Sequence, residues 1–371
     1  MVPPRGSFVE QAFMDQSKGR TKMRSTQMRH VGSSCLLAAA VVVSAAGCAS
    51  SPAGQASTAT AGGPAPTTAS NLQATIAQRL AALNAESAMY AKDLRTGREV
   101  SVRPDQPVNT VSVIKIPVMV LAFRDAESGR LNLDERYTIR REDLRRGTGL
   151  LSTFAVGLQP TYRDLITQMI ITSDNTATDI MITRVGLDRV NRMLDSLGYR
   201  ETRLRMPISQ LFRGVWEQLD PKYHTLTDRE VYEKSPPNDS GATARSFAYV
   251  GDSTRWFGRT TPREMSRFLE QIQKGELANQ QSTHDMVAIL RRQFYFSRLP
   301  QRIRFRAAVG HKTGDWPPII GNDVGIIYGA SGPIVVSVFT NQNKGDFFDL
   351  EATIGRIAED LLNAWGGSTK A

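Results

Sequence analysis

Hydrophobic residues recur along this chain at the spacings of helices and strands, and their order predicts the architecture. Leu72 and Ile76 lie four residues apart on one face of a predicted helix over 71–86. The stretch 87–103 has the pattern of two strands joined at Gly97. Further helices are predicted over 112–127, 161–170, 175–184, 187–197, 262–274, 282–292 and 347–364. Three more strands are predicted over 304–313, 322–329 and 333–341.

The order of these elements predicts an α/β fold in which both chain ends build one sheet. Strands occur near the two ends, with a block of helices between them. The sheet should be antiparallel, because its last strands are joined by hairpins. We therefore expect one domain over 71–366, with an α/β part (71–128 and 256–366) and an inserted all-helical part (129–255). Prolines and glycines predict an irregular insert near 205–255.

The first 70 residues have the pattern of an export signal followed by a tether. Basic residues precede a short apolar run at 36–43, which is too short to span a bilayer as a stable helix. The small residues before Cys48 resemble a bacterial lipobox, so we expect a signal peptide over 1–47 and lipidation of Cys48. The alternative is ordinary cleavage that yields a soluble exported protein, and Met23 or Met28 is a candidate start. Residues 48–70 are Ser-, Ala-, Thr-, Gly- and Pro-rich, which predicts a flexible tether. The expected location is the periplasm or cell envelope.

Composition and charge exclude several classes of protein. The 371 residues are 40% hydrophobic and 22% charged, which argues against disordered, collagen-like and coiled-coil chains. The formal net charge is +10. The leader contributes a surplus of four basic residues and leaves about +6, which suits an anionic surface or substrate better than nucleic acid. The arginine-rich stretches 136–146 and 291–306 are interpreted as solvated faces, or else as contacts for an anionic envelope polymer. The only cysteines are Cys35 and Cys48, so a disulfide framework or cysteine metal site is excluded from the body, and no metal or cofactor is predicted.

Ser112 and Lys115 form the first motif with catalytic potential. Ser112 opens a predicted helix, and a residue three positions later lies on the same face. A serine hydroxyl becomes a good nucleophile when a neighbouring base accepts its proton, and a lysine with a depressed pKa can be that base. Taken alone, the pair is equally an N-cap serine and a snorkelling lysine.

Two further motifs lie far along the chain. Ser173-Asp174-Asn175 falls between two predicted helices, where these residue types are also common caps and turns. Lys312-Thr313-Gly314 ends a predicted strand, and its alternative interpretation is a strand end entering a turn. Neither motif is specific by itself.

Together, in this order, the three motifs resemble the class A branch of the serine β-lactamase and penicillin-binding superfamily. The strings 170–177 and 310–314 carry the resemblance, together with 322–328. It covers about 72–204 and 256–365. It implies a β-lactamase-like fold, with a three-layer α-β-α arrangement and a helical subdomain.

The resemblance also implies roles for individual residues. Ser112 would be the acylated nucleophile and Lys115 its general base or part of the proton path. Ser173 would relay a proton to the leaving nitrogen, and Asn175 would bind the substrate amide and Lys115. On the strand, Lys312 would supply a positive field for a substrate carboxylate and would hold Ser173. Thr313 would hydrogen-bond that carboxylate, and Gly314 would allow close approach. The backbone N–H groups of Ser112 and Asp315 would form the oxyanion hole.

Two departures from the family pattern place deacylation in doubt. Class A enzymes carry a glutamate after the second motif that activates the hydrolytic water. Here Thr202-Arg203-Leu204 matches the start of that loop, but no acid follows in 205–208. Glu217 is the substitute candidate, with a surface carboxylate as the alternative. Asp315 stands where related enzymes carry a small neutral or hydroxyl residue. Its carboxylate could repel a substrate carboxylate or pair with a nearby arginine, and its backbone N–H can still serve the oxyanion hole.

These observations leave three functional hypotheses. The first is an exported class A-like serine β-lactamase, with slow deacylation as a variant. The second is a D-Ala-D-Ala carboxypeptidase-like or esterase enzyme that only binds penicillin. The third is a non-catalytic cell-wall-binding lipoprotein. The expected partners are a small β-lactam or acyl-peptide substrate and, through the lipid, a membrane. We expect a monomer.

Overall fold

The computed structural model describes residues 69–234, 239 and 241–367. The predicted signal peptide, Cys48 and the predicted tether up to residue 68 lie outside the described residues. Across the described ranges, no helix combines the length and the apolar character that a membrane crossing requires.

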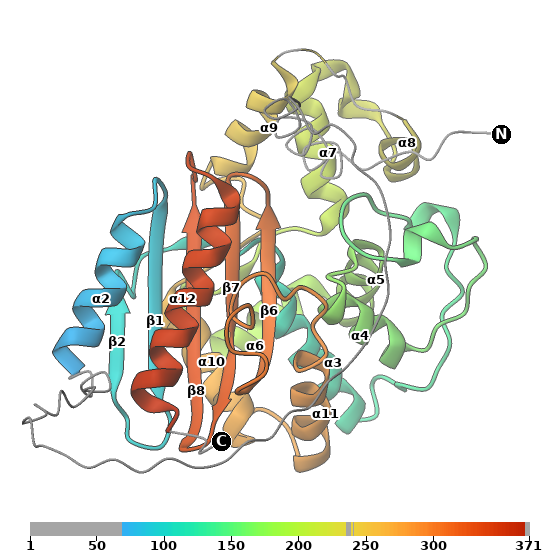
Figure 1. Ribbon diagram of the computed structural model, residues 1–371. Coiled ribbons are helices and arrows are strands. Elements are labelled where there is room, and N and C mark those ends of the chain that lie inside the picture. Colours follow the sequence, from blue (N-terminus) through green and yellow to red (C-terminus); the bar gives the residue numbers. More distant parts are fainter. Residues whose placement is uncertain (1–68, 235–238, 240, 368–371) are drawn as a thin grey trace, which may run out of the picture.

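A five-stranded antiparallel sheet forms the centre of the fold (Figure 1). Its strand order joins both chain ends, as predicted, because β1 pairs with β2 on one side and with β8 on the other. In spatial order the strands are β2 (Glu99–Val102), β1 (Glu86–Asp93), β8 (Gly332–Asn341), β7 (Ile320–Gly329) and β6 (Ala308–Trp316). β6 is therefore an edge strand.

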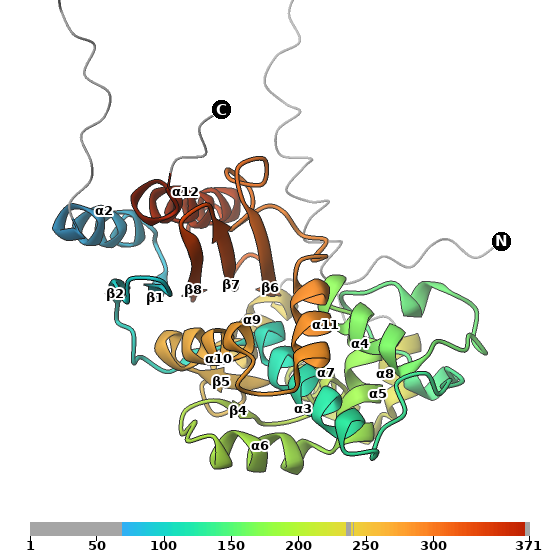
Figure 2. The same ribbon diagram turned by 90° about the horizontal axis from the view of Figure 1, so that it is seen from below.

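Helices cover both faces of this sheet, which confirms the α-β-α arrangement. α2 (Ala69–Ala81) and α12 (Phe347–Trp365) lie on one face (Figure 2). Their apolar stripes, including Ile76 and Ile354, pack with sheet residues such as Val336 in one buried cluster. The other face carries α10 (Pro262–Lys274) and the helical part, and a second apolar cluster fills the space between them.

The helices predicted in and beside the helical part are present. They are α3 (Lys115–Glu127), α4 (Tyr162–Ile171), α5 (Asn175–Val185), α6 (Leu187–Ser196) and α11 (Gln280–Leu290). The short 3-10 helices η1 (Val111–Ile114), η2 (Arg141–Asp143) and η3 (Leu151–Thr153) were not predicted. Side-chain caps fix several starts: Thr161 and Asp164 form a capping box on α4, and Asp174 accepts the N–H of Ala177 at the start of α5. A small sheet of β3 (Val108–Asn109), β5 (Gly258–Thr260) and β4 (Arg203–Leu204) joins this part to the start of η1.

The segment 205–255 is more regular than predicted. It contains α7 (Ile208–Leu219), η4 (Pro221–Thr225), α8 (Asp228–Glu233) and α9 (Ala242–Gly251). The prolines and glycines that indicated loops stand at helix ends, where they are tolerated: Pro207 precedes α7, Pro221 opens η4, and Gly241 precedes α9. The expectation of an irregular insert was therefore wrong for these elements.

Candidate active site

The three motifs, far apart in the sequence, meet at the hydroxyl of Ser173. The Lys115 ammonium donates to Ser173 Oγ at 3.1 Å, to Ser173 O at 2.7 Å and to Asn175 Oδ1 at 2.9 Å. The Lys312 ammonium donates to the same Ser173 Oγ at 3.0 Å and to Thr313 O at 2.7 Å. Both lysines are fully buried. One serine hydroxyl thus lies between two ammonium groups from different parts of the chain.

Ser112 lies on η1 and is half-buried beside β6. Within the described part of the chain, its Oγ makes no hydrogen bond, whereas Ser112 O accepts the backbone N–H of Lys115. A Cβ at Gly314 would lie 2.4 Å from Thr110 O and 3.3 Å from Val113 N. β6 therefore contacts the turn that carries Ser112, and only glycine allows this approach.

Two non-glycine residues with positive φ lie at or next to the predicted catalytic residues. Val111, next to Ser112, has φ 41° and Ser173 has φ 56°. A β-branched residue in this region is strained and persists only where its surroundings fix it. Asn109 supplies such fixation, because its Oδ1 accepts the Val111 N–H at 3.0 Å.

A buried asparagine network then joins this turn to the sheet. Asn322 Nδ2 donates to Asn109 O at 2.9 Å, and Asn341 Oδ1 accepts the Asn109 N–H at 2.9 Å. Sequence reasoning did not assign these residues to the site. The available signal was the presence of buried-looking asparagines in otherwise apolar strands.

Burial depresses the basicity of both lysines. The pKa of Lys115 lies well below its usual value, first because the side chain is buried and then because Lys312 is close. Burial also lowers the pKa of Lys312 to about 7. Burial raises the pKa of the neighbouring Asp174 carboxyl. A lowered pKa makes it easier for the Lys115 ammonium to give up its proton, which favours Lys115 as a general base.

The loop 145–150 holds the second motif in place. Thr148 Oγ1 donates to Ser173 O at 2.7 Å, and Asn175 Nδ2 donates to Arg146 O at 2.8 Å. Asp174 Oδ2 accepts the backbone N–H groups of Leu150 and Leu151 at 2.7 and 2.8 Å. These contacts orient Ser173 and Asn175, and no sequence pattern indicated that Thr148 would take part.

Asp179 fixes the start of α7 against this region. Its carboxylate accepts the N–H groups of Ile208 at 2.6 Å and Ser209 at 2.8 Å, and it pairs with Arg145 Nε at 2.6 Å. Arg145 is mostly buried, so the expectation of a fully solvated face over 136–146 was wrong at this residue.

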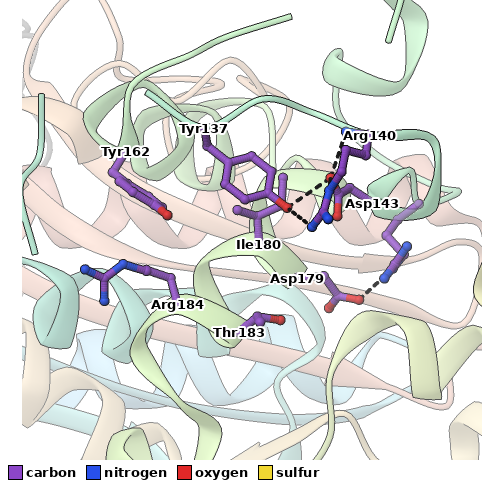
Figure 3. Close-up of a pocket in the computed structure, with 9 residues that line it drawn as sticks. Tyr137, Arg140, Asp143, Tyr162, Asp179, Ile180, Thr183 and Arg184 are labelled. Carbon is purple, nitrogen blue, oxygen red and sulfur yellow. Dashed lines mark hydrogen bonds and ion pairs between the residues drawn. The ribbon is translucent and has the colours of Figure 1, made fainter. Parts of the chain in front are cut away.

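A cavity of about 280 Å³ lies beside this ion pair (Figure 3). Its lining comprises Tyr137, Arg140, Asp143, Arg145, Tyr162, Asp179, Ile180, Thr183 and Arg184. None of the predicted site residues is among them, so the cavity is distinct from the cluster around Ser173.

Glu217 is not brought to the cluster. It lies on α7 with an exposed side chain, and its charge reaches Tyr249 of α9, where it adds to burial in raising the phenol pKa. The α7 side chain of Phe212 faces the motif region, because its ring would lie 3.2 Å from a Cβ at Gly147 and is centred 5.9 Å from the Trp316 ring. Five residues correspond to about 140° around a helix, so Glu217 points to a different side of α7. The structure gives this candidate base no contact with the motifs.

Asp315 pairs with an arginine that the sequence interpretation had assigned to solvent. Its carboxylate accepts from Arg298, which also lies 3.1 Å from Glu351 and is buried. The interpretation of 291–306 as a solvated face is therefore wrong at Arg298 as well. Thr313 Oγ1 is buried and lacks a hydrogen-bond partner among the described residues. Its predicted role as a carboxylate ligand stays a prediction.

His311, the residue before Lys312, lies on β6, and its Nδ1 lies 2.9 Å from Asp323 Oδ1. The described ranges contain no group of three or more His, Cys, Asp or Glu side chains arranged to hold a metal ion.

Comparisons with known proteins agree with this geometry. A family model described as the beta-lactamase enzyme family matches residues 70–365. A β-lactamase of Streptomyces lavendulae is 24% identical over 290 residues, which are 76% of this chain and 83% of that protein. The crystal structure of a β-lactamase from Sphaerobacter thermophilus is similar with a TM-score of 0.64 and 26% identity, over 80% of this chain and 97% of that chain. A mutant of PBP-A in an acyl-enzyme complex with penicillin G has a TM-score of 0.63 and 23% identity, over 80% of this chain and 96% of that chain.

Proposed function

Because the chain belongs to the beta-lactamase enzyme family and is a serine β-lactamase-like hydrolase, we propose that it opens the β-lactam amide by class A chemistry through an acyl-Ser112 intermediate. The observation that carries this proposal is the pair of buried ammonium groups on Ser173 Oγ, next to the turn that bears Ser112.

In the acylation step Ser112 Oγ bonds to the lactam carbonyl carbon while Lys115 accepts its proton. The developing oxyanion accepts hydrogen bonds from the backbone N–H groups of Ser112 and Asp315. The lactam C–N bond then breaks, and Ser173 passes a proton to the leaving nitrogen. Ser173 suits this relay because its Oγ contacts both Lys115 and Lys312.

Deacylation is proposed to be slow. Hydrolysis of the ester requires a base that activates water within hydrogen-bonding reach. Glu217 points away from the motifs, and α7 presents Phe212 on the side that faces them. The similarity to the PBP-A complex with penicillin G supports a stable acyl-enzyme as part of this proposal.

The direct test uses purified protein and penicillin G. Intact-mass spectrometry with peptide mapping should show one adduct on Ser112, and Ser112→Ala should abolish it. A chromogenic lactam then measures turnover. The proposed function would be overturned if no adduct and no turnover appeared under conditions in which penicillin G labels a known penicillin-binding enzyme.

A second candidate is a D-Ala-D-Ala carboxypeptidase-like or esterase activity with the same nucleophile. The observation that favours it is again Glu217, which points away from the motifs and so is not placed to activate water for hydrolysis of a lactam adduct. Its prediction is steady turnover of a thioester depsipeptide together with a long-lived penicillin adduct. Fast lactam turnover without depsipeptide cleavage would reject it.

We also propose export to the cell envelope and anchoring of a monomer through lipid on Cys48. The motivating pattern is the small-residue run before Cys48. Cys48→Ser should release the protein from the membrane fraction and abolish incorporation of labelled palmitate. Unchanged fractionation of this variant would refute the anchor.

A further inference from the structure

We propose that Asp315 is a specificity-determining residue that selects acyl substrates whose group beside β6 is uncharged or cationic over substrates that carry a carboxylate there. This inference rests on the proposed function, since it concerns the substrate class of the same site.

Asp315 lies on β6 next to the point where this strand contacts the turn that carries Ser112. It directly follows Gly314, whose backbone touches the turn between Thr110 and Val113. Alternate residues of a strand point to one face, so Asp315 shares its face with Thr313 and not with Lys312. Its side chain is 19% exposed, which leaves the carboxylate accessible.

The arginine nearest to this position is already occupied. Arg298 is 4% exposed in its side chain, and one terminal nitrogen contacts both Asp315 and Glu351. The other terminal nitrogen donates to Asn322 O at 2.9 Å. Only Nε lacks a partner among the described residues, and it is buried. Arg298 therefore has no fork of two donors left for a substrate carboxylate.

More carboxylates lie around Arg298 than its single positive charge can neutralise. Glu351 accepts from Ser297 Oγ at 2.5 Å in addition to its contact with Arg298. Asp323 lies opposite Thr313 in the register and pairs with His311. A substrate anion placed beside Thr313 would meet Asp315 and these further carboxylates. Lys312 would still attract such an anion, but the guanidinium of Arg298 is already shared among carboxylates.

The field of Asp315 extends to the catalytic cluster. Burial and then the charge of Asp315 raise the pKa of Tyr295 to about 12. Asp315 also opposes the burial that lowers the pKa of Lys115 and of Lys312. A group that acts on both motif lysines also acts on a charged substrate between them.

The size of the effect follows from Coulomb interaction. Two like charges about 10 Å apart in a medium of effective dielectric constant about 20 repel enough to change a rate or binding constant by on the order of tenfold. Asp315→Asn removes that charge while keeping the size of the side chain and an oxygen that accepts from Arg298.

The test compares acylation of Ser112 by penicillin G and by its methyl ester, which differ only in the carboxylate. Rates come from intact-mass spectrometry of the adduct. Asp315→Asn should raise the ratio of the acid rate to the ester rate about tenfold, mainly through the acid. Glu351→Gln should raise the ratio less, because Glu351 reaches the site only through Arg298. The matched control is Glu135→Gln, an exposed residue before α4 that makes the same change in net charge and should leave the ratio unchanged.

The outcomes separate this inference from the proposed function. Normal labelling of Ser112 with an unchanged ratio in Asp315→Asn would overturn the selectivity and leave the proposed function intact. A second variant, Asp315→Ala, guards against misfolding, and an unchanged ratio there would overturn it equally. No adduct from either probe on the unmodified protein would overturn both.

Discussion

Removal of the Asp179 carboxylate should destabilise the protein far more than an ordinary surface substitution. The residue that precedes α7 is Pro207, which has no side-chain acceptor for the first N–H groups of the helix. Asp179, from α5, accepts two of them, at Ile208 and Ser209, and also receives Arg145. Asp179→Ala leaves these three donors without their acceptor in a buried place.

The magnitude follows from these contacts. A hydrogen bond to a charged group contributes about 1.5–3 kcal/mol, and breaking a buried ion pair costs about 3–5 kcal/mol. The three contacts share one carboxylate, so their energies do not add. We expect Asp179→Ala to lower the free energy of unfolding by about 4 kcal/mol, and Asp179→Asn, which keeps one acceptor oxygen, by about 2 kcal/mol.

Urea titration followed by far-UV circular dichroism measures the loss directly. The control is Asp228→Asn, which removes the more exposed partner of Arg145 at 3.2 Å and should cost less than about 1 kcal/mol. A loss below about 1 kcal/mol in Asp179→Ala, or an equal loss in Asp228→Asn, would refute the assignment of Asp179 as the anchor of α7.

Three other outcomes are expected. Gly314→Ala should slow acylation of Ser112 and destabilise the fold by about 1–3 kcal/mol, because the added Cβ would lie 2.4 Å from Thr110 O. The control Gly345→Ala, where the nearest atom lies at 3.5 Å, should change neither acylation nor stability. Equal effects of the two substitutions would contradict this prediction. Burial lowers the pKa of Lys312 to about 7, so its ammonium is present below that pH and lost above it. The ratio of acylation by penicillin G to acylation by its methyl ester should therefore fall as pH rises through 7, and Lys312→Arg should remove this step; a flat ratio in the unmodified protein would count against it. Glu217→Gln should leave lactam turnover within about twofold, and a hundredfold slower deacylation would show that this carboxylate is the base after all.

Much of the fold follows from local signals that the sequence carries openly. The capping box at Thr161 and the apolar stripe of α12 are encoded within a few residues, and both elements appear where they were expected. The structure of the insert over 205–255 was harder to predict, because proline and glycine are common at helix ends as well as in loops. Pro207 and Pro221 therefore indicated irregular structure although each begins a helical segment.

The candidate site, like the fold, could be predicted from the sequence only in part. Three short motifs identified Lys115, Ser173 and Lys312, which the structure joins by hydrogen bonds. The groups that hold them, such as Thr148 and Asn109, depend on contacts between distant segments and have no sequence signature of their own. The direction of Glu217 was equally inaccessible, since it depends on how α7 is rotated against its neighbours.

The pairing of β1 with β8 has a consequence for the timing of activity. Glu86 pairs with Asn341, so partners in the middle of the sheet lie about 250 residues apart along the chain. During synthesis from the N-terminus, Ser112 is made about 200 residues before Lys312. Reactivity toward an acyl donor should therefore begin only after β6 has been made and has paired with the rest of the sheet.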